Sequence, residues 1–228
     1  MITCRRRIAA HRCAGLTSIN MKSQAQPTKR RPGRPLSFDR EAALQKAMLV
    51  FWRHGYEASS LSELTAAMGV TPPSLYAAFG DKKRLFLEAV RRYMEEPDIS
   101  EEIIRRAPTA HQAVVDFLTG AAMGCTQKGR PAGCLLSNGS TNCSPASSDV
   151  QRTMTRLRAR IEKSLEERIR QGLEQGELAA SADPAVLAAF FMSVARGMAL
   201  QAQDGAKRER LLAVASAAAA AWPGVKTR

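Results

Sequence analysis

Several features of exported, membrane-bound and catalytic proteins are missing from this sequence of 228 residues. No stretch reaches the ~18 to 20 apolar residues that cross a bilayer. The basic opening MITCRRRIAAHRC lacks the apolar segment of ~7 to 15 residues found in a secretory signal. The three histidines, His11, His54 and His111, lie in unrelated segments, and neither a catalytic triad nor a glycine-rich phosphate loop has coherent spacing. We therefore expect a cytoplasmic protein that has no membrane partner and is not an enzyme.

The cysteine pattern gives no support for a metal centre or a cofactor. There are five cysteines, an odd number, and no CxxC pair that would suit zinc. None of the histidines neighbours Cys125, Cys134 or Cys143. Without an export signal the thiols are expected to be reduced. The sequence thus predicts no metal site and no cofactor.

Positive charge is present in excess, but it is unevenly placed. Of the net charge of +13, residues 1–35 supply +9, from nine Lys/Arg and no Asp/Glu. Residues 36–96 carry eight bases and eight acids, and residues 97–228 carry seventeen bases and thirteen acids. We expect residues 1–35 to form a disordered basic arm, with Met21 as an alternative start of translation. Any nucleic-acid surface in the folded part must come from the arrangement of its residues rather than from bulk charge.

The folded part has the composition and periodicity of an all-α protein. Aromatic residues make up only 5% of the sequence, and alanine is abundant. Apolar residues spaced by three and four from Phe38 predict a helix that Gly55 terminates. Ser60 followed by Glu63 predicts a capping box, and Gly69 ends the short helix that follows.

The stretch VTPPSLYAAF predicts a second short helix directly after that glycine. Thr71 suits the N-cap, and Pro72 suits the first helical position, where its missing N–H has no partner to lose. Two short helices separated by a tight turn predict a helix-turn-helix at about residues 59–78, which would bind double-stranded DNA. The same spacing also occurs in helical bundles that do not bind DNA.

The open side of the second helix carries small or hydrogen-bonding groups. Leu75 and Phe79 are four residues apart and should face the first helix. Small side chains let a helix approach base edges, Tyr76 offers a phenol to a phosphate, and Lys82 lies in the first turn of the next helix. The predicted DNA contacts from this pattern are Pro73, Ser74, Tyr76, Ala77 and Lys82.

From Arg34 to Arg92 the chain resembles the DNA-binding head of the TetR family of transcriptional regulators, most clearly in GYEASSLSELTAAMGVTPPSLYAAFGDKKRLF. The resemblance implies a homodimeric, mostly repressive regulator with a DNA-binding domain at residues 36–96 and a helical effector and dimerisation domain at residues 97–228. It implies a pseudo-palindromic operator. By motif, it assigns backbone contacts and recognition-helix positions to Ser60, Ser62, Thr71, Pro72, Pro73, Ser74, Tyr76, Ala77 and Lys82.

The arm adds one candidate contact of its own. Gly33-Arg34-Pro35 resembles the centre of an AT-hook, in which an arginine enters a narrow A·T minor groove. Pro32 replaces the arginine that such hooks carry before the glycine. Insertion of Arg34 therefore competes with non-specific attraction to phosphates, and a non-specific DNA-coating protein driven by the arm is the alternative function.

The C-terminal half predicts five helices. The last two are expected to form a four-helix dimer interface, with an ordinary intramolecular core as the alternative. Their expected ranges are 99–106, 110–128, 146–175, 184–203 and 206–221.

The segment GRPAGCLLSNGSTNCSP places two of the cysteines in a polar, glycine-rich region. Thiols near a helix N-terminus or a cation react with oxidants and electrophiles, and the GCLL element resembles one found in a branch of the family that includes electrophile- and metal-stress regulators. We therefore predict Cys134, with Cys125 and Cys143, as a possible thiol sensor. Burial as a small apolar residue is the alternative for Cys134. The effector is predicted to be a small molecule or an electrophile.

Overall fold

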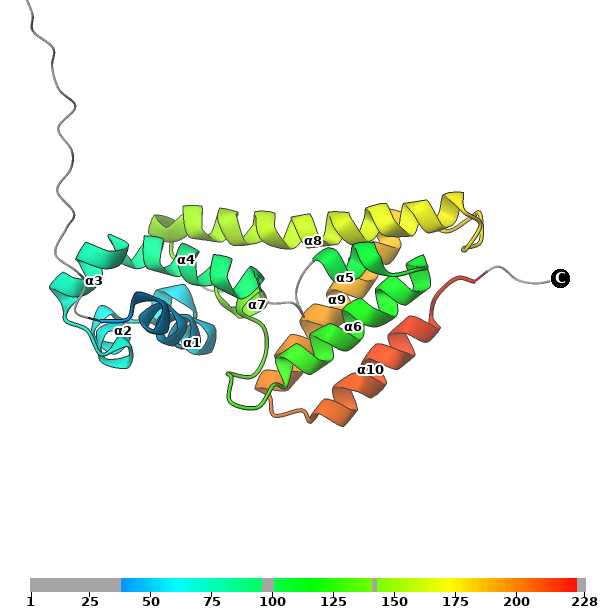
Figure 1. Cartoon of the computed structure of the whole chain (residues 1–228). Helices are drawn as coiled ribbons and strands as arrows, with labels where there is room; N and C mark the ends of the chain where they lie inside the picture. Colours follow the sequence, from blue (N-terminus) through cyan, green and yellow to red (C-terminus); the bar gives the residue numbers. More distant parts are fainter. Residues whose placement is uncertain (1–37, 96–100, 141–142, 225–228) are drawn as a thin grey trace, which may run out of the picture. The chain divides into compact units, whose positions relative to one another are not determined.

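The computed structural model describes residues 38–95, 101–140 and 143–224, and within these ranges it is helical with no strand (Figure 1). The all-α prediction is confirmed. The basic arm, including Arg34, lies outside the described residues. The helices in chain order are α1 (Arg40–Ala58), α2 (Leu61–Met68), α3 (Pro72–Phe79), α4 (Lys82–Met94), α5 (Glu101–Arg106), α6 (Ala110–Cys125), α7 (Leu135–Asn138), the 3-10 turn η2 (Pro145–Ser147), α8 (Ser148–Glu174), α9 (Pro184–Gln203) and α10 (Arg208–Ala220).

The first four helices, called the head below, pack around one aromatic cluster. α1 contacts both α2 and α4. Phe51 meets Phe86 edge-on with ring centroids 5.1 Å apart, and Trp52 meets Tyr93 in the same way at 4.8 Å. Burial of a large apolar side chain contributes about 1.5–3 kcal/mol, so this cluster fixes α4 against α1.

The start of α2 confirms half of the predicted capping box. Ser60 accepts a hydrogen bond from the backbone N–H of Glu63 at 3.1 Å. The carboxylate of Glu63 does not complete the box; it pairs instead with His54 Nε2 at 3.0 Å. His54 of α1 thus binds the Glu63 carboxylate in place of the cap. The helix loses little stability, because the Ser60 oxygen alone still satisfies one of its free backbone N–H groups.

The predicted turn between α2 and α3 is present. Gly69 adopts a left-handed conformation, with φ 71° and ψ 35°, and its N–H bonds back to Thr65. Thr71 caps α3 and Pro72 occupies its first turn. Leu75 and Phe79 are buried as expected. α3 ends at Phe79, one residue beyond the predicted end of the motif.

The C-terminal helices pack with α6 against α9 and α10, and with α8 against α9. The prediction of residues 184–203 for α9 is confirmed. α6 ends at Cys125 rather than at residue 128, because the Thr126 hydroxyl bonds back to Ala122 and Gly129 then adopts a positive φ of 80°. α8 begins at Ser148, after the 3-10 turn, and α10 begins at Arg208. The short helix α7 was not predicted at all.

One described helix, α9, has the length and composition to cross a membrane, with a mean hydropathy of 1.5. The expectation that no segment would reach that length and apolarity was therefore wrong. About a third of this window is buried in the structure (33%), and α9 contacts α6, α8 and α10. Its buried residues are Ala188, Phe191, Met192, Met198, Ala199 and Ala202, and the charged Arg196 lies within the helix.

Candidate DNA-binding surface and effector cavity

The exposed face of α3 presents the side chains predicted to contact DNA. Thr71, Pro72, Pro73 and Ala77 are exposed, and Tyr76 is 47% exposed. The hydroxyls of Thr71 and Ser74 lie 2.9 Å apart and share a hydrogen bond, while Thr71 also accepts the Ser74 backbone N–H. This pairing holds both hydroxyls in place at the N-terminal end of α3, the end that reads bases in helix-turn-helix proteins.

At the start of α2 the two predicted serines are also exposed. Ser60 uses its oxygen as the helix cap, which leaves its hydroxyl proton able to donate. Ser62 lies in the first turn, where the early backbone N–H groups of a helix favour an anion. Both positions suit a phosphate group better than a base.

Lys82 is less accessible than its sequence position indicates. Its ammonium group donates to the Glu57 carbonyl at 3.2 Å and lies 4.6 Å from the centre of the Tyr56 ring. Burial lowers the pKa of Lys82, and the nearby Glu57 partly offsets this. Lys82 therefore ties the start of α4 to the end of α1, in addition to its predicted role at a phosphate.

Arg40, which the sequence did not single out, fixes three helices of the head. Its guanidinium makes two hydrogen bonds to Glu88, at 2.6 and 2.7 Å, and one to the Ala78 carbonyl at 3.4 Å. The same group lies 4.4 Å from the centre of the Phe79 ring. The bidentate pair with Glu88 ties α1 to α4, and the contacts with Ala78 and Phe79 hold α3 against both. Phe79 and Glu88 lie 39 and 48 positions after Arg40, so no local sequence pattern indicates these contacts.

α7 connects the C-terminal half to the head. At Gly55, α1 leaves helical geometry, with φ 75° and ψ 175°. The next residue, Tyr56, donates its N–H to the Gly139 carbonyl at 2.9 Å. A Cβ on Gly55 would lie 3.2 Å from the Asn138 carbonyl oxygen, which is tighter than most real contacts. The glycine thus permits a close approach between two backbones.

A second contact lies beside the first. Ser147 donates a hydrogen bond to Glu57 at 2.9 Å. The pKa of Glu57 is lowered, first by a hydrogen bond from Ser144 and then by the one from Ser147. Cys143 lies close enough to Glu57 and Lys82 for their charges to act on its pKa, which burial raises. Of the three predicted sensor cysteines, Cys143 is therefore beside the head.

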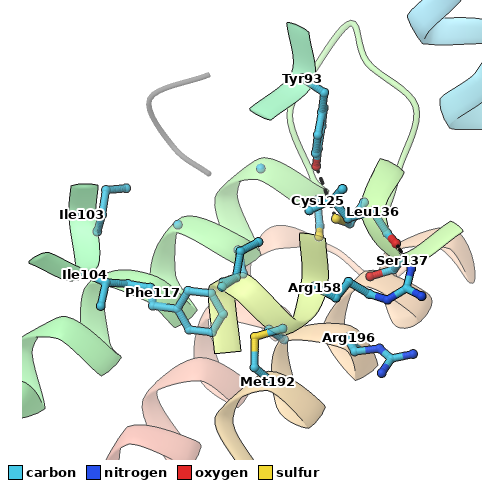
Figure 2. A pocket seen from close by; sticks show the side chains of 16 residues that line it. Tyr93, Ile103, Ile104, Phe117, Cys125, Leu136, Ser137, Arg158, Met192 and Arg196 are labelled. Carbon is cyan, nitrogen blue, oxygen red and sulfur yellow. Dashed lines mark hydrogen bonds between the residues drawn. The ribbon is translucent and has the colours of Figure 1, made fainter. Parts of the chain in front are cut away.

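The other two cysteines line one cavity of about 90 Å³ in the C-terminal half (Figure 2). The hydroxyl of Tyr93 donates to the sulfur of Cys134 at 3.3 Å. Burial, and secondarily Cys134, raises the pKa of Cys125 to about 12, so Cys125 is a neutral thiol at physiological pH. Cys134 is partly buried and is the N-cap residue of α7. The described residues contain no group of three His, Cys, Asp or Glu side chains that could hold a metal ion.

Comparison with known proteins agrees with this arrangement. Residues 43–89 match the family described as "Bacterial regulatory proteins, tetR family", and residues 110–218 match "Tetracyclin repressor-like, C-terminal domain". The chain belongs to the TetR family. The prediction made from residues 34–92 is thereby confirmed. Two proteins from Escherichia coli (strain K12) are similar to this TetR-family chain. The HTH-type transcriptional repressor ComR is 36% identical to it, over 87% of this chain and 95% of ComR. The HTH-type transcriptional repressor BdcR is also 36% identical, over 52% of this chain and 61% of BdcR.

A solved structure extends the similarity to three dimensions. The TetR family transcriptional regulator CifR, as a cysteine mutant complexed with 26 bp double-strand operator DNA, is 41% identical to this chain. The match has a TM-score of 0.79 and covers 84% of this chain and all of that one (100%). The TetR fold of this chain, an N-terminal helix-turn-helix followed by a larger helical part, is therefore established.

Proposed function

We propose that this chain is a one-component transcriptional repressor that acts in the cytoplasm and binds a pseudo-palindromic operator as a homodimer. In this proposal residues 36–96 are the DNA-binding domain and residues 97–228 the effector and dimerisation domain. Two copies of α3 enter successive major grooves, about 34–36 Å apart. The observation that carries the proposal is the exposed face of α3 on a TetR-type head. Repressors among the relatives, and operator DNA in the CifR complex, support it.

The homodimer is supported by an apolar face on α9. Val186, Phe190 and Leu200 are 64%, 43% and 59% exposed. They share one side of the helix with Gly197, where a Cβ would meet no atom within 4 Å. A small residue flanked by exposed apolar ones suits close packing against a second helix, as in the four-helix interface predicted for α9 and α10.

The route from effector to DNA runs through α4 and α7. α4 begins at the head with Lys82 and carries Tyr93 at the cavity. α7 begins just after Cys134 and ends beside Gly55 and Tyr56. A ligand in the cavity, or a group added to the thiol of Cys134, changes the Tyr93–Cys134 contact and with it the position of α4. Each arrangement of α4 gives a different spacing of the two α3 helices.

We consider two hypotheses for the effector, a thiol-reactive compound and a non-covalent ligand. The first experiment is a gel shift of the purified protein on its own upstream intergenic DNA and on random DNA, with and without a mild electrophile or hypochlorite. Tight, sequence-dependent binding supports the repressor. Equal affinity for both DNAs at physiological salt contradicts it and favours coating by the basic arm, whose binding falls steeply with salt.

The variant Cys134→Ser distinguishes a thiol-reactive effector from a non-covalent ligand. Release by the electrophile that disappears in this variant identifies Cys134 as the sensor. Release that persists, or operator binding indifferent to the electrophile, turns the search to a non-covalent ligand. As a TetR-family regulator with no catalytic constellation in its sequence, the chain is expected to show no enzymatic activity.

A further inference from the structure

Two arginines line the same side of the cavity described above. Arg158 reaches it from α8 and Arg196 from α9, and their side chains lie near each other in Figure 2. No aspartate or glutamate is among the described residues that line the cavity. Two guanidinium groups therefore share one small cavity whose wall supplies no negative charge.

The hydrogen bonds of Arg158 all go to uncharged oxygens. It donates to the Leu136 carbonyl at 2.7 Å, to the Thr155 hydroxyl at 3.1 Å and to the Ser140 hydroxyl at 3.4 Å. These bonds orient the guanidinium without neutralising it. The pKa of Arg158 is lowered, mainly by burial and secondarily by the charge of Arg196. Like charges held together in a partly buried place attract an anion that would sit between them.

The side of the cavity away from the arginines is apolar. Ile103 and Phe117 lie on the side away from the arginines, and Met192 lies between the two sides (Figure 2). The cavity has a volume of about 90 Å³. It is smaller than an engineered cavity of about 150 Å³ that holds benzene. The space therefore suits a short aliphatic chain better than an aromatic ring.

We propose that this cavity binds a short-chain aliphatic carboxylate as a non-covalent effector. The carboxylate lies between Arg158 and Arg196, whose planar guanidinium groups match it in a bidentate manner. The aliphatic chain points toward Phe117 and Met192. Arg196 is exposed, so the charged end of the ligand lies at the mouth of the cavity and the chain fills its interior. This inference rests on the proposed function, because it names the class of effector that the repressor would respond to.

The test is a calorimetric titration of the full chain with butanoate, with its neutral counterpart butanamide, and with inorganic phosphate at constant ionic strength. We expect butanoate to bind at least about tenfold more tightly than butanamide, since a hydrogen-bonded charge contributes more than a neutral group. Phosphate, which has no chain to bury, should bind more weakly than butanoate. Equal binding of butanoate and butanamide, or phosphate binding as tight as that of butanoate, would overturn the inference.

Variants of Arg196 check the position of the anion without disturbing the fold, because this side chain is exposed. Arg196→Gln should weaken butanoate about tenfold or more, and Arg196→Lys should recover part of the loss. Arg156→Gln is the control: Arg156 is an exposed arginine of α8 that does not line this cavity, and its loss should leave butanoate binding unchanged. Unchanged binding in Arg196→Gln would contradict the proposed site.

The gel shift on upstream DNA distinguishes this inference from the proposed function. Wild-type protein that binds butanoate and selects its upstream DNA, with butanoate releasing the DNA, supports both. Protein that selects its DNA but does not bind butanoate overturns the carboxylate inference alone. Protein that binds butanoate in the titration but shows no preference for its upstream DNA overturns the proposed repressor and leaves the anion site standing.

Discussion

The hydroxyl of Tyr93 donates a hydrogen bond of 3.3 Å to the sulfur of Cys134, joining the last turn of α4 to the residue that precedes α7. Tyr93 also packs edge-on against Trp52, in the core of the head. A single side chain therefore touches both the cavity and the aromatic cluster that positions α1. A group added to the sulfur of Cys134 would therefore displace the hydroxyl of Tyr93.

Tyr93→Phe tests that connection. The substitution keeps the ring and removes one hydrogen bond, so the free energy of unfolding should fall by about 1 kcal/mol or less. Operator release by an effector should be weakened more clearly, because the link between cavity and α4 is lost. Urea unfolding and gel shifts with effector measure the two effects. Tyr56→Phe, a hydroxyl deletion outside the cavity, is the control; effector release in Tyr93→Phe as efficient as in this control would contradict the route.

Gly55→Ala tests the close approach between α1 and α7. The backbone of Gly55 lies in a region nearly restricted to glycine, and the new Cβ would press on the Asn138 carbonyl. We expect a loss of about 1–3 kcal/mol in stability. Gly69→Ala is the control for a left-handed backbone with open space around it, and should cost about 1 kcal/mol. Equal losses in urea unfolding would show that neither the backbone conformation of Gly55 nor its contact with α7 adds to this cost.

Leu200→Glu tests the proposed dimer face. A carboxylate there would be buried without a partner in the interface, so dimerisation should weaken by at least about tenfold. Operator affinity should fall with it, because the two heads would no longer be linked. Sedimentation equilibrium gives the dimer constant, and Gln171→Glu, an exposed position on α8, controls for the added charge. A dimer constant unchanged by Leu200→Glu would place the interface elsewhere.

The raised pKa of Cys125 predicts how stability varies at alkaline pH. In the unfolded chain this thiol ionises near its ordinary value of 9.0, whereas in the folded chain it keeps its proton until about pH 12. The folded state then binds more protons between these values, so stability falls as pH rises, by up to about 1.4 kcal/mol per unit. The free energy of unfolding of Cys125→Ala, measured with urea between pH 8 and pH 10, should depend less on pH than that of the wild type. A slope identical to that of the wild type would mean that Cys125 is not held neutral by the fold.

Lys82→Gln tests the prediction that Lys82 contacts a phosphate despite its place over Tyr56. If it does so in each subunit, the slope of log affinity against log salt should become shallower by about 0.9 per contact. Affinity for operator and random DNA should fall together, since phosphate contacts carry no sequence information. Lys163→Gln, an exposed lysine of α8, is the control. An unchanged slope would assign Lys82 to the packing of α4 on α1 alone.

The elements predicted well from the sequence are those set by neighbouring residues. Thr71 and Pro72 specify the start of α3, and Gly69 specifies the turn before it, through interactions within four positions along the chain. Repeating apolar positions likewise specify the long helices. The positions of their ends were less accurate where a hydroxyl, such as that of Thr126, competes for the last turn.

The parts missed by the sequence depend on contacts between distant residues. α7 has only four residues, too few for a periodic pattern, and it is placed by the contact of Gly139 with Tyr56. The cavity needs Arg158 and Arg196 on two different helices, and nothing local marks them as neighbours. The predicted DNA contacts came from a linear motif, whereas the role of Arg40 in holding α3 needs Glu88, which is 48 positions away.

The thirteen residues of α4 form an unbroken helix from Lys82, next to α3, to the turn that carries Tyr93 at the cavity. At a rise of ~1.5 Å per residue, its length is about 20 Å. A tilt of about 5° around the Tyr93 end therefore carries the Lys82 end through roughly 2 Å, by simple geometry on that length. A displacement of that size exceeds the distance tolerance of a hydrogen bond. In the repressor that we propose, a tilt of α4 by a few degrees would therefore be enough to separate the DNA-contacting side chains from their partners.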